Sequence, residues 1–83
     1  MERTKSVHIH YYGAFREATG LSEETVQSQA ATAADLYHEI DRQHRLLFDL
    51  SVLRVALNDQ IVPWTSVVSE GDTVVFLAPF AGG

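Results

Sequence analysis

The chain has 83 residues, of which 46% are hydrophobic and 20% are charged, and this composition indicates one small folded domain. Because the chain has no cysteine, a disulfide framework, a thiolate metal site, an iron–sulfur cluster and a cysteine nucleophile are excluded. The net charge of -5, with only six basic residues, argues against binding to nucleic acid or an anionic membrane and favours a protein partner with a basic surface. No segment resembles a membrane span or a secretory signal, so we expect a cytoplasmic protein.

The first third of the chain predicts two strands. Residues 5–12 alternate apolar and polar side chains, which is typical of a strand with one buried face. Residues 14–21 are expected to form a loop or one short helical turn that Gly20 ends. Residues 22–29 are mostly polar and suit an outer strand with one wet face, so the two strands should form a hairpin.

The middle of the chain predicts a helix over residues 33–46. The Thr32 hydroxyl can cap its first turn, where Asp35 favours the positive end of the helix dipole. Residues spaced three and four apart form its expected buried stripe, namely Ala33, Leu36, Tyr37, Ile40, His44 and Leu47.

The last third predicts three further strands. Residues 52–57 are rich in aliphatic and β-branched side chains, and Asn58-Asp59-Gln60 suits a turn that tolerates left-handed backbone. Ile61 and Val62 can pair briefly before Pro63 removes a donor. After a turn at 70–72, the almost wholly apolar segment 73–78 predicts a central strand with both faces covered.

This order predicts an α+β domain over residues 1–78. If the first and last strands are parallel neighbours, the connection between them must contain the crossover helix. The result is a β-grasp (ubiquitin-like) fold, a mixed sheet of four to five strands packed on one main helix. A ferredoxin-like fold is the rival arrangement, but it needs a second helix that the sequence does not supply.

Residues 79–83, Pro-Phe-Ala-Gly-Gly, are expected to form a flexible tail. Pro79 cannot continue a central ladder, and Gly82 and Gly83 lack side chains that would block a narrow channel. A carboxylate at Gly83 could attack the α-phosphate of ATP to give an acyl-adenylate, with a partner supplying the phosphate site. A glycine-rich end without function is the alternative, and the β-grasp prediction favours the functional interpretation.

Three segments carry a family resemblance. The chain resembles the MoaD/ThiS ubiquitin-like sulfur carriers in these segments. The loop after strand one is similar at residues 12–20 (Tyr-Gly-Ala-Phe-Arg-Glu-Ala-Thr-Gly), and the turn and the entry to the last strand are similar at residues 57–62 and 70–74. The Pro-x-Ala-Gly-Gly end is similar at residues 76–83. The molybdopterin synthase small subunits are the most similar members. Ala78 departs from a common proline and Phe80 from a smaller apolar residue.

The resemblance implies a two-stage cycle in molybdenum cofactor biosynthesis. A ubiquitin-activating-type enzyme would adenylate Gly83 with ATP and Mg²⁺, and a sulfur donor would convert the adenylate to a thiocarboxylate. Pro79, Phe80, Ala81 and Gly82 would then thread into the molybdopterin synthase large subunit of a heterotetramer, where the sulfur reaches the pterin precursor. This chain would bind no cofactor, and the active site would lie on the large subunit.

Other side chains have less distinctive patterns. Phe15 and Leu77, with Phe80, are predicted to contact the partner as an exposed apolar patch. His8 and His10 have the spacing of a metal pair, but no third ligand is near them in sequence, so we predict no metal site and a solvated or partner-facing strand face.

Three other functions remain open. A thiamin-type sulfur carrier shares the Gly-Gly end but usually lacks the Pro-x-Ala stem, which is the segment from Pro79 to Ala81 in this chain. A ubiquitin-like protein modifier would instead join Gly83 to lysines through an isopeptide bond. A β-grasp interaction domain with an inert end is the third.

Overall fold

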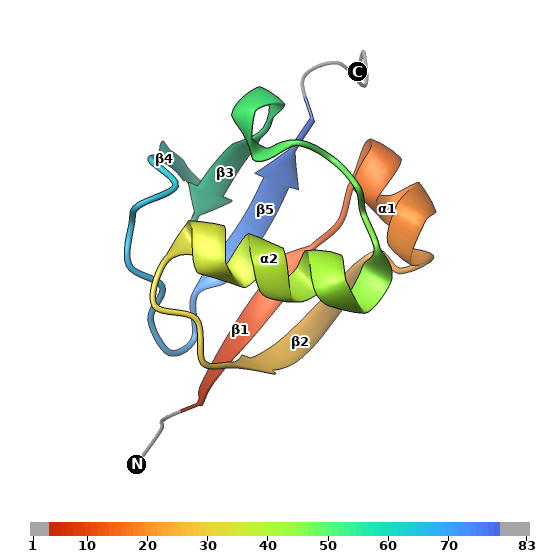
Figure 1. The fold of residues 1–83 in the computed structure, drawn as a ribbon. Coiled ribbons are helices and arrows are strands. Elements are labelled where there is room, and N and C mark those ends of the chain that lie inside the picture. Colours follow the sequence, from red (N-terminus) through yellow and green to blue (C-terminus); the bar gives the residue numbers. More distant parts are fainter. Residues whose placement is uncertain (1–3, 79–83) are drawn as a thin grey trace.

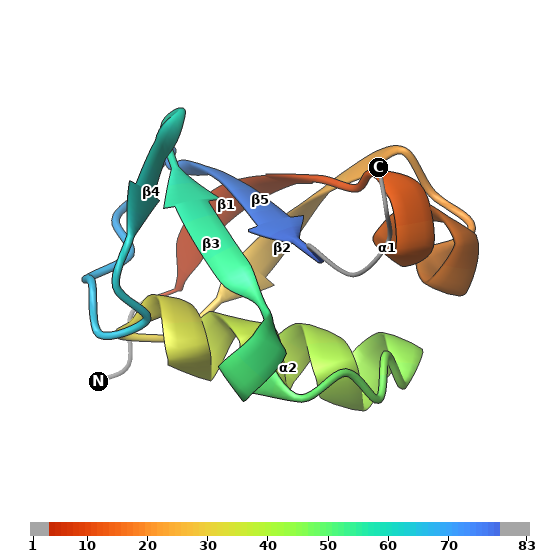
Figure 2. The ribbon, with the colours of Figure 1, turned by 90° about the horizontal axis from the view of Figure 1, so that it is seen from above.

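The computed structural model describes residues 4–78, and residues 1–3 and the predicted tail 79–83 lie outside this range. One mixed sheet lies across one long helix (Figures 1 and 2). The elements are, in chain order, β1 (Lys5–His10), α1 (Gly13–Thr19), β2 (Glu23–Ser28), α2 (Ala33–His44), the 3-10 helix η1 (Leu50–Val52), β3 (Arg54–Leu57), β4 (Gln60–Val62) and β5 (Thr73–Leu77). No helix within residues 4–78 has the length and apolar character needed to cross a bilayer.

The strand order β2-β1-β5-β3-β4 confirms the predicted β-grasp arrangement. β1 is antiparallel to β2 and parallel to β5, and β3 is antiparallel to both β5 and β4. The crossover that parallel pairing requires contains α2, which covers one face of the sheet (Figure 2). β5 is central and lies beside β1, as predicted.

The segment after β1 is more helical than expected. β1 ends at His10, two residues before the predicted end, and the chain enters α1 at Gly13, whose φ is 52°. α1 has seven residues rather than one turn. Gly20, with φ 75°, ends it as predicted and donates its backbone N–H to the carbonyl of Arg16.

α2 begins as predicted and ends early. The Thr32 hydroxyl accepts a hydrogen bond from the Asp35 N–H at 3.2 Å. The helix ends at His44, because Arg45 adopts a left-handed conformation with φ 55°. The three- and four-residue spacing of buried side chains therefore does not extend beyond His44, and the prediction that Leu47 is buried was wrong. Leu47 is 85% exposed, whereas Leu46 is 4% exposed.

The β3–β4 turn lies at the predicted Asn58-Asp59, but Gln60, which was expected in the turn, is the first residue of β4 and pairs with Leu57. Asn58 and Asp59 both have positive φ, 52° and 72°, as a two-residue hairpin turn requires. The Asn58 side chain accepts the Thr73 N–H and donates to Asp72, which ties this turn to the start of β5. β3 starts two residues later than predicted, because Leu50–Val52 form η1.

The expectation that β5 is covered on both faces was wrong. Val74 and Phe76 are buried against α2, whereas Thr73, Val75 and Leu77 on the other face are only half-buried. No helix of the described chain lies over that outer face (Figure 2). The apolar run of β5 therefore gives the open face of the sheet a partly apolar centre.

Aromatic rings dominate the core. The ring of Phe76 lies 5.9 Å from Phe15, 5.3 Å from Tyr37 and 6.1 Å from Trp64, measured between centroids. The Tyr37 hydroxyl donates to the carbonyl of Phe48 at 3.0 Å. Burial, assisted by the charge of Asp41, raises the pKa of Tyr37 to about 12.

Two leucines allow a matched test of the core. Leu36→Ala should lower the free energy of unfolding by about 2 to 5 kcal/mol, because this fully buried side chain leaves a cavity. Leu47→Ala makes the same chemical change at an exposed position and should cost under about 0.5 kcal/mol. Urea unfolding at neutral pH measures both, and equal losses would contradict the assigned burial.

Tyr37 should make the fold sensitive to alkali. Because its folded pKa of about 12 lies above the reference value of 10.0, its stabilising effect is complete below pH 10 and is lost as the pH rises toward 12. The loss from this group alone should reach about 1 kcal/mol at pH 11. Tyr37→Phe should lack this component, so urea unfolding from pH 8 to 11 should give a shallower decline than in the parent chain. Parallel declines would contradict the prediction.

Candidate functional site at the carboxyl end of β5

The sheet topology gathers three segments at the end of β5. Because β1 and β5 are parallel, α1 after β1 and Ala78 after β5 lie at the same end of the sheet (Figure 1). β3 is antiparallel to β5, so η1 before β3 also lies there. The chain therefore leaves the described domain between a short helix and a 3-10 turn.

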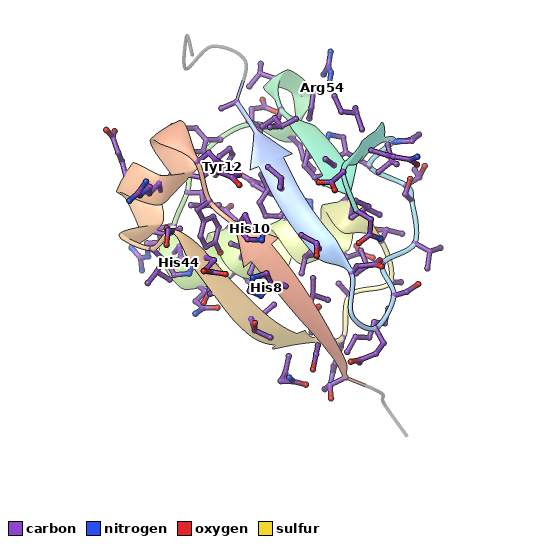
Figure 3. The ribbon with its side chains drawn as sticks, turned by 180° about the vertical axis from the view of Figure 1, so that it is seen from behind. His8, His10, Tyr12, His44 and Arg54 are labelled. Carbon is purple, nitrogen blue, oxygen red and sulfur yellow. The ribbon has the colours of Figure 1, made fainter. Side chains whose placement is uncertain are left out.

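Four side chains surround this exit, and we call them the exit edge: Tyr12, Val52, Arg54 and Leu77. Tyr12 is 58% exposed at the start of α1, and Val52 is 45% exposed on η1. Arg54 is exposed (Figure 3), and its register partner on β5 is the half-buried Leu77. The exit edge offers apolar contact area and one positive charge, and none of its members is a carboxylate or an imidazole.

Sequence patterns identified only part of this edge. Leu77 was predicted to contact a partner, and its half-buried position on the outer face leaves that prediction open. Tyr12, Val52 and Arg54 were not singled out. The alternation that places Tyr12 on the same strand face as His8 and His10 was an available signal for an outward-facing ring. The position of η1 was not readable from the sequence.

Phe15 requires a correction. It was expected in an exposed apolar patch, but it is 1% exposed, and its ring lies 5.1 Å from that of Phe48 and 5.9 Å from that of Phe76. The reason is that residues 13–19 form a helix, which turns Phe15 into the core. Phe15 therefore supports the end of β5 from inside.

The predicted reactive end lies outside the described residues. This applies to Pro79, Phe80, Ala81, Gly82 and Gly83. The described chain stops at Ala78, which is half-buried and packs against the core. The domain thus holds β5 in place up to the residue before Pro79, by burying Val74 and Phe76.

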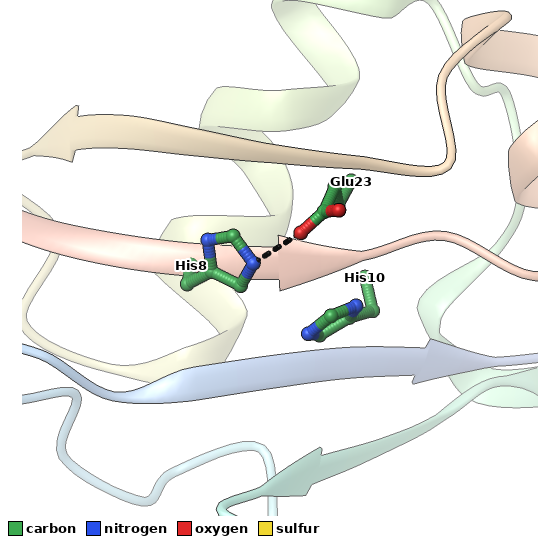
Figure 4. A group of neighbouring side chains, drawn as sticks. All are labelled: His8, His10 and Glu23. Carbon is green, nitrogen blue, oxygen red and sulfur yellow. Dashed lines mark hydrogen bonds and ion pairs between the residues drawn. The ribbon is translucent and has the colours of Figure 1, made fainter.

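A second cluster lies on the outer face of β1 and β2. The cross-strand register sets Glu23 opposite His10 and Thr25 opposite His8. One imidazole nitrogen from each of His8 and His10 and a carboxylate oxygen of Glu23 all lie within 4.8 Å of one another (Figure 4). The sequence showed no third ligand beside the histidine pair, and the structure supplies one from the neighbouring strand.

The remaining histidines have other surroundings. His38 is exposed on α2. His44 contacts the carboxylate of Glu24 at 2.8 Å, and the Tyr11 hydroxyl donates to the same carboxylate at 2.6 Å. Burial, together with the hydrogen bond to Glu24, raises the pKa of Tyr11 well above its usual range. This network joins the end of α2 to β2 and to the residue that follows β1.

Known proteins resemble this chain in both sequence and fold. Residues 9–83 match the model of the ThiS family. The chain is 32% identical over 80 residues to a molybdopterin synthase sulfur carrier subunit of Mycobacterium tuberculosis, covering 93% of this chain and 96% of that protein. Among solved structures, a putative molybdopterin converting factor subunit 1 from Pyrococcus furiosus is 26% identical with a TM-score of 0.74, covering 87% of this chain and 94% of that one.

A further structure that shares the fold is a protein–protein complex of subunits 1 and 2 of the molybdopterin-converting factor from Helicobacter pylori. The matching chain of this complex is 22% identical with a TM-score of 0.64, and the match covers 94% of this chain and 99% of that one. The family match begins at residue 9, within β1, and includes every later strand of the described chain. It continues through Gly82 and Gly83. On this evidence the chain belongs to the ThiS family of MoaD/ThiS ubiquitin-like proteins.

Proposed function

We propose that this chain is a sulfur carrier for molybdenum cofactor biosynthesis and serves as the small subunit of a molybdopterin synthase. The observation that carries the proposal is the near full-length similarity to a molybdopterin synthase sulfur carrier subunit, at 32% identity. The family match also includes the Gly82-Gly83 end on which the chemistry would depend.

The proposed cycle uses the carboxylate of Gly83. One of its oxygens attacks the α-phosphate of ATP on a separate Mg²⁺-dependent activating enzyme, and pyrophosphate leaves. A donor of sulfide-level sulfur then displaces AMP to leave a thiocarboxylate. This sulfur displaces an oxygen leaving group from a carbon of the pterin precursor on the large subunit. Water then cleaves the acyl–sulfur bond, which restores the carboxylate and leaves the sulfur on the pterin. Since the chain has no cysteine that could hold a persulfide, the carboxyl of Gly83 is the proposed site of the sulfur.

The domain contributes position rather than catalysis. Ala78 is held at the core, so the five residues that follow have a maximum reach of about 17 Å beyond it. Pro79 would direct the stem away from the sheet, and Gly82 would let the end pass where a Cβ could not. The reach is enough to place Gly83 inside a partner while the domain stays outside.

The exit edge is the proposed contact surface for the large subunit. It surrounds the point where the stem would leave, and its exposed Tyr12 and Val52 offer apolar area that a partner could cover. The Helicobacter pylori structure, in which a chain of this fold belongs to a complex of subunits 1 and 2, supports a two-chain assembly.

Charging of Gly83 is directly measurable. After incubation with an activating enzyme, ATP, Mg²⁺ and a sulfur donor, intact-mass spectrometry should show one oxygen replaced by one sulfur. A chain lacking Gly83 should show no such change, because the reacting carboxyl is misplaced. Unmodified mass in the complete chain would contradict the carrier proposal. Lysine-linked conjugates ending in Gly83 would favour a protein modifier, and sulfur transfer only to a thiazole precursor would favour a thiamin-type carrier.

Two valines test the proposed contact surface. Val52→Ala removes apolar area from the exit edge and should weaken binding to the large subunit by about five-fold, on the order of 1 kcal/mol. Val67→Ala makes the same change at a residue that is 69% exposed beside the start of α2, and should leave binding unchanged. Titration calorimetry with the large subunit measures both. Equal affinities for the two variants would place the contact elsewhere.

A further inference from the structure

The outer face of β1 and β2 carries a group of side chains that the proposed sulfur chemistry does not use. His8 and His10 are two residues apart on β1 and share one face, and their ring centroids are 4.7 Å apart. Glu23 on β2 is the register partner of His10. Two imidazoles and a carboxylate therefore converge from two strands on one region of the sheet surface (Figure 4).

Hydrogen bonds already orient one of these imidazoles. The Nδ1 of His8 lies 2.8 Å from the hydroxyl oxygen of Thr25, and its Nε2 lies 2.6 Å from Oε1 of Glu23. A hydroxyl can donate or accept a hydrogen bond, so the Thr25 oxygen can accept a hydrogen bond from the Nδ1–H of His8 when Nε2 gives its lone pair to a cation. Outer contacts of this kind orient the histidine ligands of metal ions.

To hold an ion, one pair of ligand atoms in the group must separate, and pairs that are up to 4.8 Å apart must approach by up to about 1.5 Å. Two ligand atoms at about 2.0 to 2.1 Å from a tetrahedral Zn²⁺ are about 3.3 Å apart. The His8 Nε2 and Glu23 Oε1 atoms would have to separate by less than about 1 Å from their present 2.6 Å. The side chains of His8 and Glu23 are 36% and 54% exposed, so an ion can reach them from solvent and Glu23 has room to adjust.

We propose that His8, His10 and Glu23 form a binding site for one divalent transition-metal ion of the Zn²⁺ type, with Thr25 as a positioning residue. Two imidazoles and one carboxylate are ligands that Zn²⁺ and Cu²⁺ accept readily, whereas Mg²⁺ prefers oxygen alone. Three protein ligands leave the fourth tetrahedral position for water or for a group from another molecule. The proposal stands on these side chains alone and is independent of the sulfur-carrier function.

The ion would also link two strands. In the sheet of the described residues, β1 lies between β2 and β5, whereas β2 is an edge strand that pairs with β1. Ligands from both strands would make binding stabilise this pairing, because an ion that binds the folded state alone raises its stability. Zn²⁺ should therefore raise the melting temperature of the chain.

The test is titration of ZnCl₂ into the full chain prepared without a histidine tag. Calorimetry should show one saturable site, and MgCl₂ should give none. His10→Asn and Glu23→Gln should each weaken Zn²⁺ binding by about ten-fold or more and abolish the rise in melting temperature. His38→Asn is the matched control, since it removes an exposed imidazole from α2, and should bind Zn²⁺ as the parent chain does.

A second measurement separates loss of a ligand from loss of fold. The ¹H–¹⁵N spectrum of each variant without metal should keep the dispersion of the parent chain, and added Zn²⁺ should shift the His8 and His10 ring resonances of the parent chain. Thr25→Val should weaken binding less than His10→Asn does. Absence of saturable binding, unchanged binding in folded His10→Asn, or an equal loss in His38→Asn would each overturn the proposal.

Discussion

The parallel pairing of β1 with β5 is the constraint on which the rest of the structure depends. His8 lies opposite Thr73 and His10 opposite Val75, so strands from the two ends of the chain become neighbours at the centre of the sheet. Parallel neighbours need a crossover, and α2 occupies it. The same pairing sends the carboxyl ends of both strands to one end of the sheet, where α1 and η1 border the exit of the chain.

Burial on the helix side of β5 gives this arrangement its rigidity. Phe76 contacts the rings of Phe15, Tyr37 and Trp64, which come from α1, α2 and the segment after β4. One strand is therefore held by most of the fold, although the domain is small. The described domain therefore offers a fixed base for the residues that follow Ala78, as the proposed carrier function requires.

The two faces of the sheet have separate roles. The inner face is filled by apolar side chains against α2, whereas the outer face carries polar groups on β1 and β2 and half-buried apolar groups on β5. The same alternation that buries Val7 and Ile9 turns His8 and His10 outward. Strand alternation thus places the two histidines of the proposed metal site on the outer face, and the β1–β2 register places Glu23 beside them. The site lies beside β5 but includes no residue of the exit edge.

Local patterns in the sequence were enough to locate the strands, the Thr32 cap, the Asn58-Asp59 turn and the helix end at Gly20, because each depends on neighbouring residues alone. Family motifs pointed to the Gly-Gly end. Other features depend on longer-range structure. Where a helix starts or stops decides the burial of Phe15 and the exposure of Leu47. The pairing of residues across strands decides the approach of Glu23 to the histidines. Only the tertiary structure decided these features, since cross-strand register and chain reversal are set by packing between segments distant in sequence.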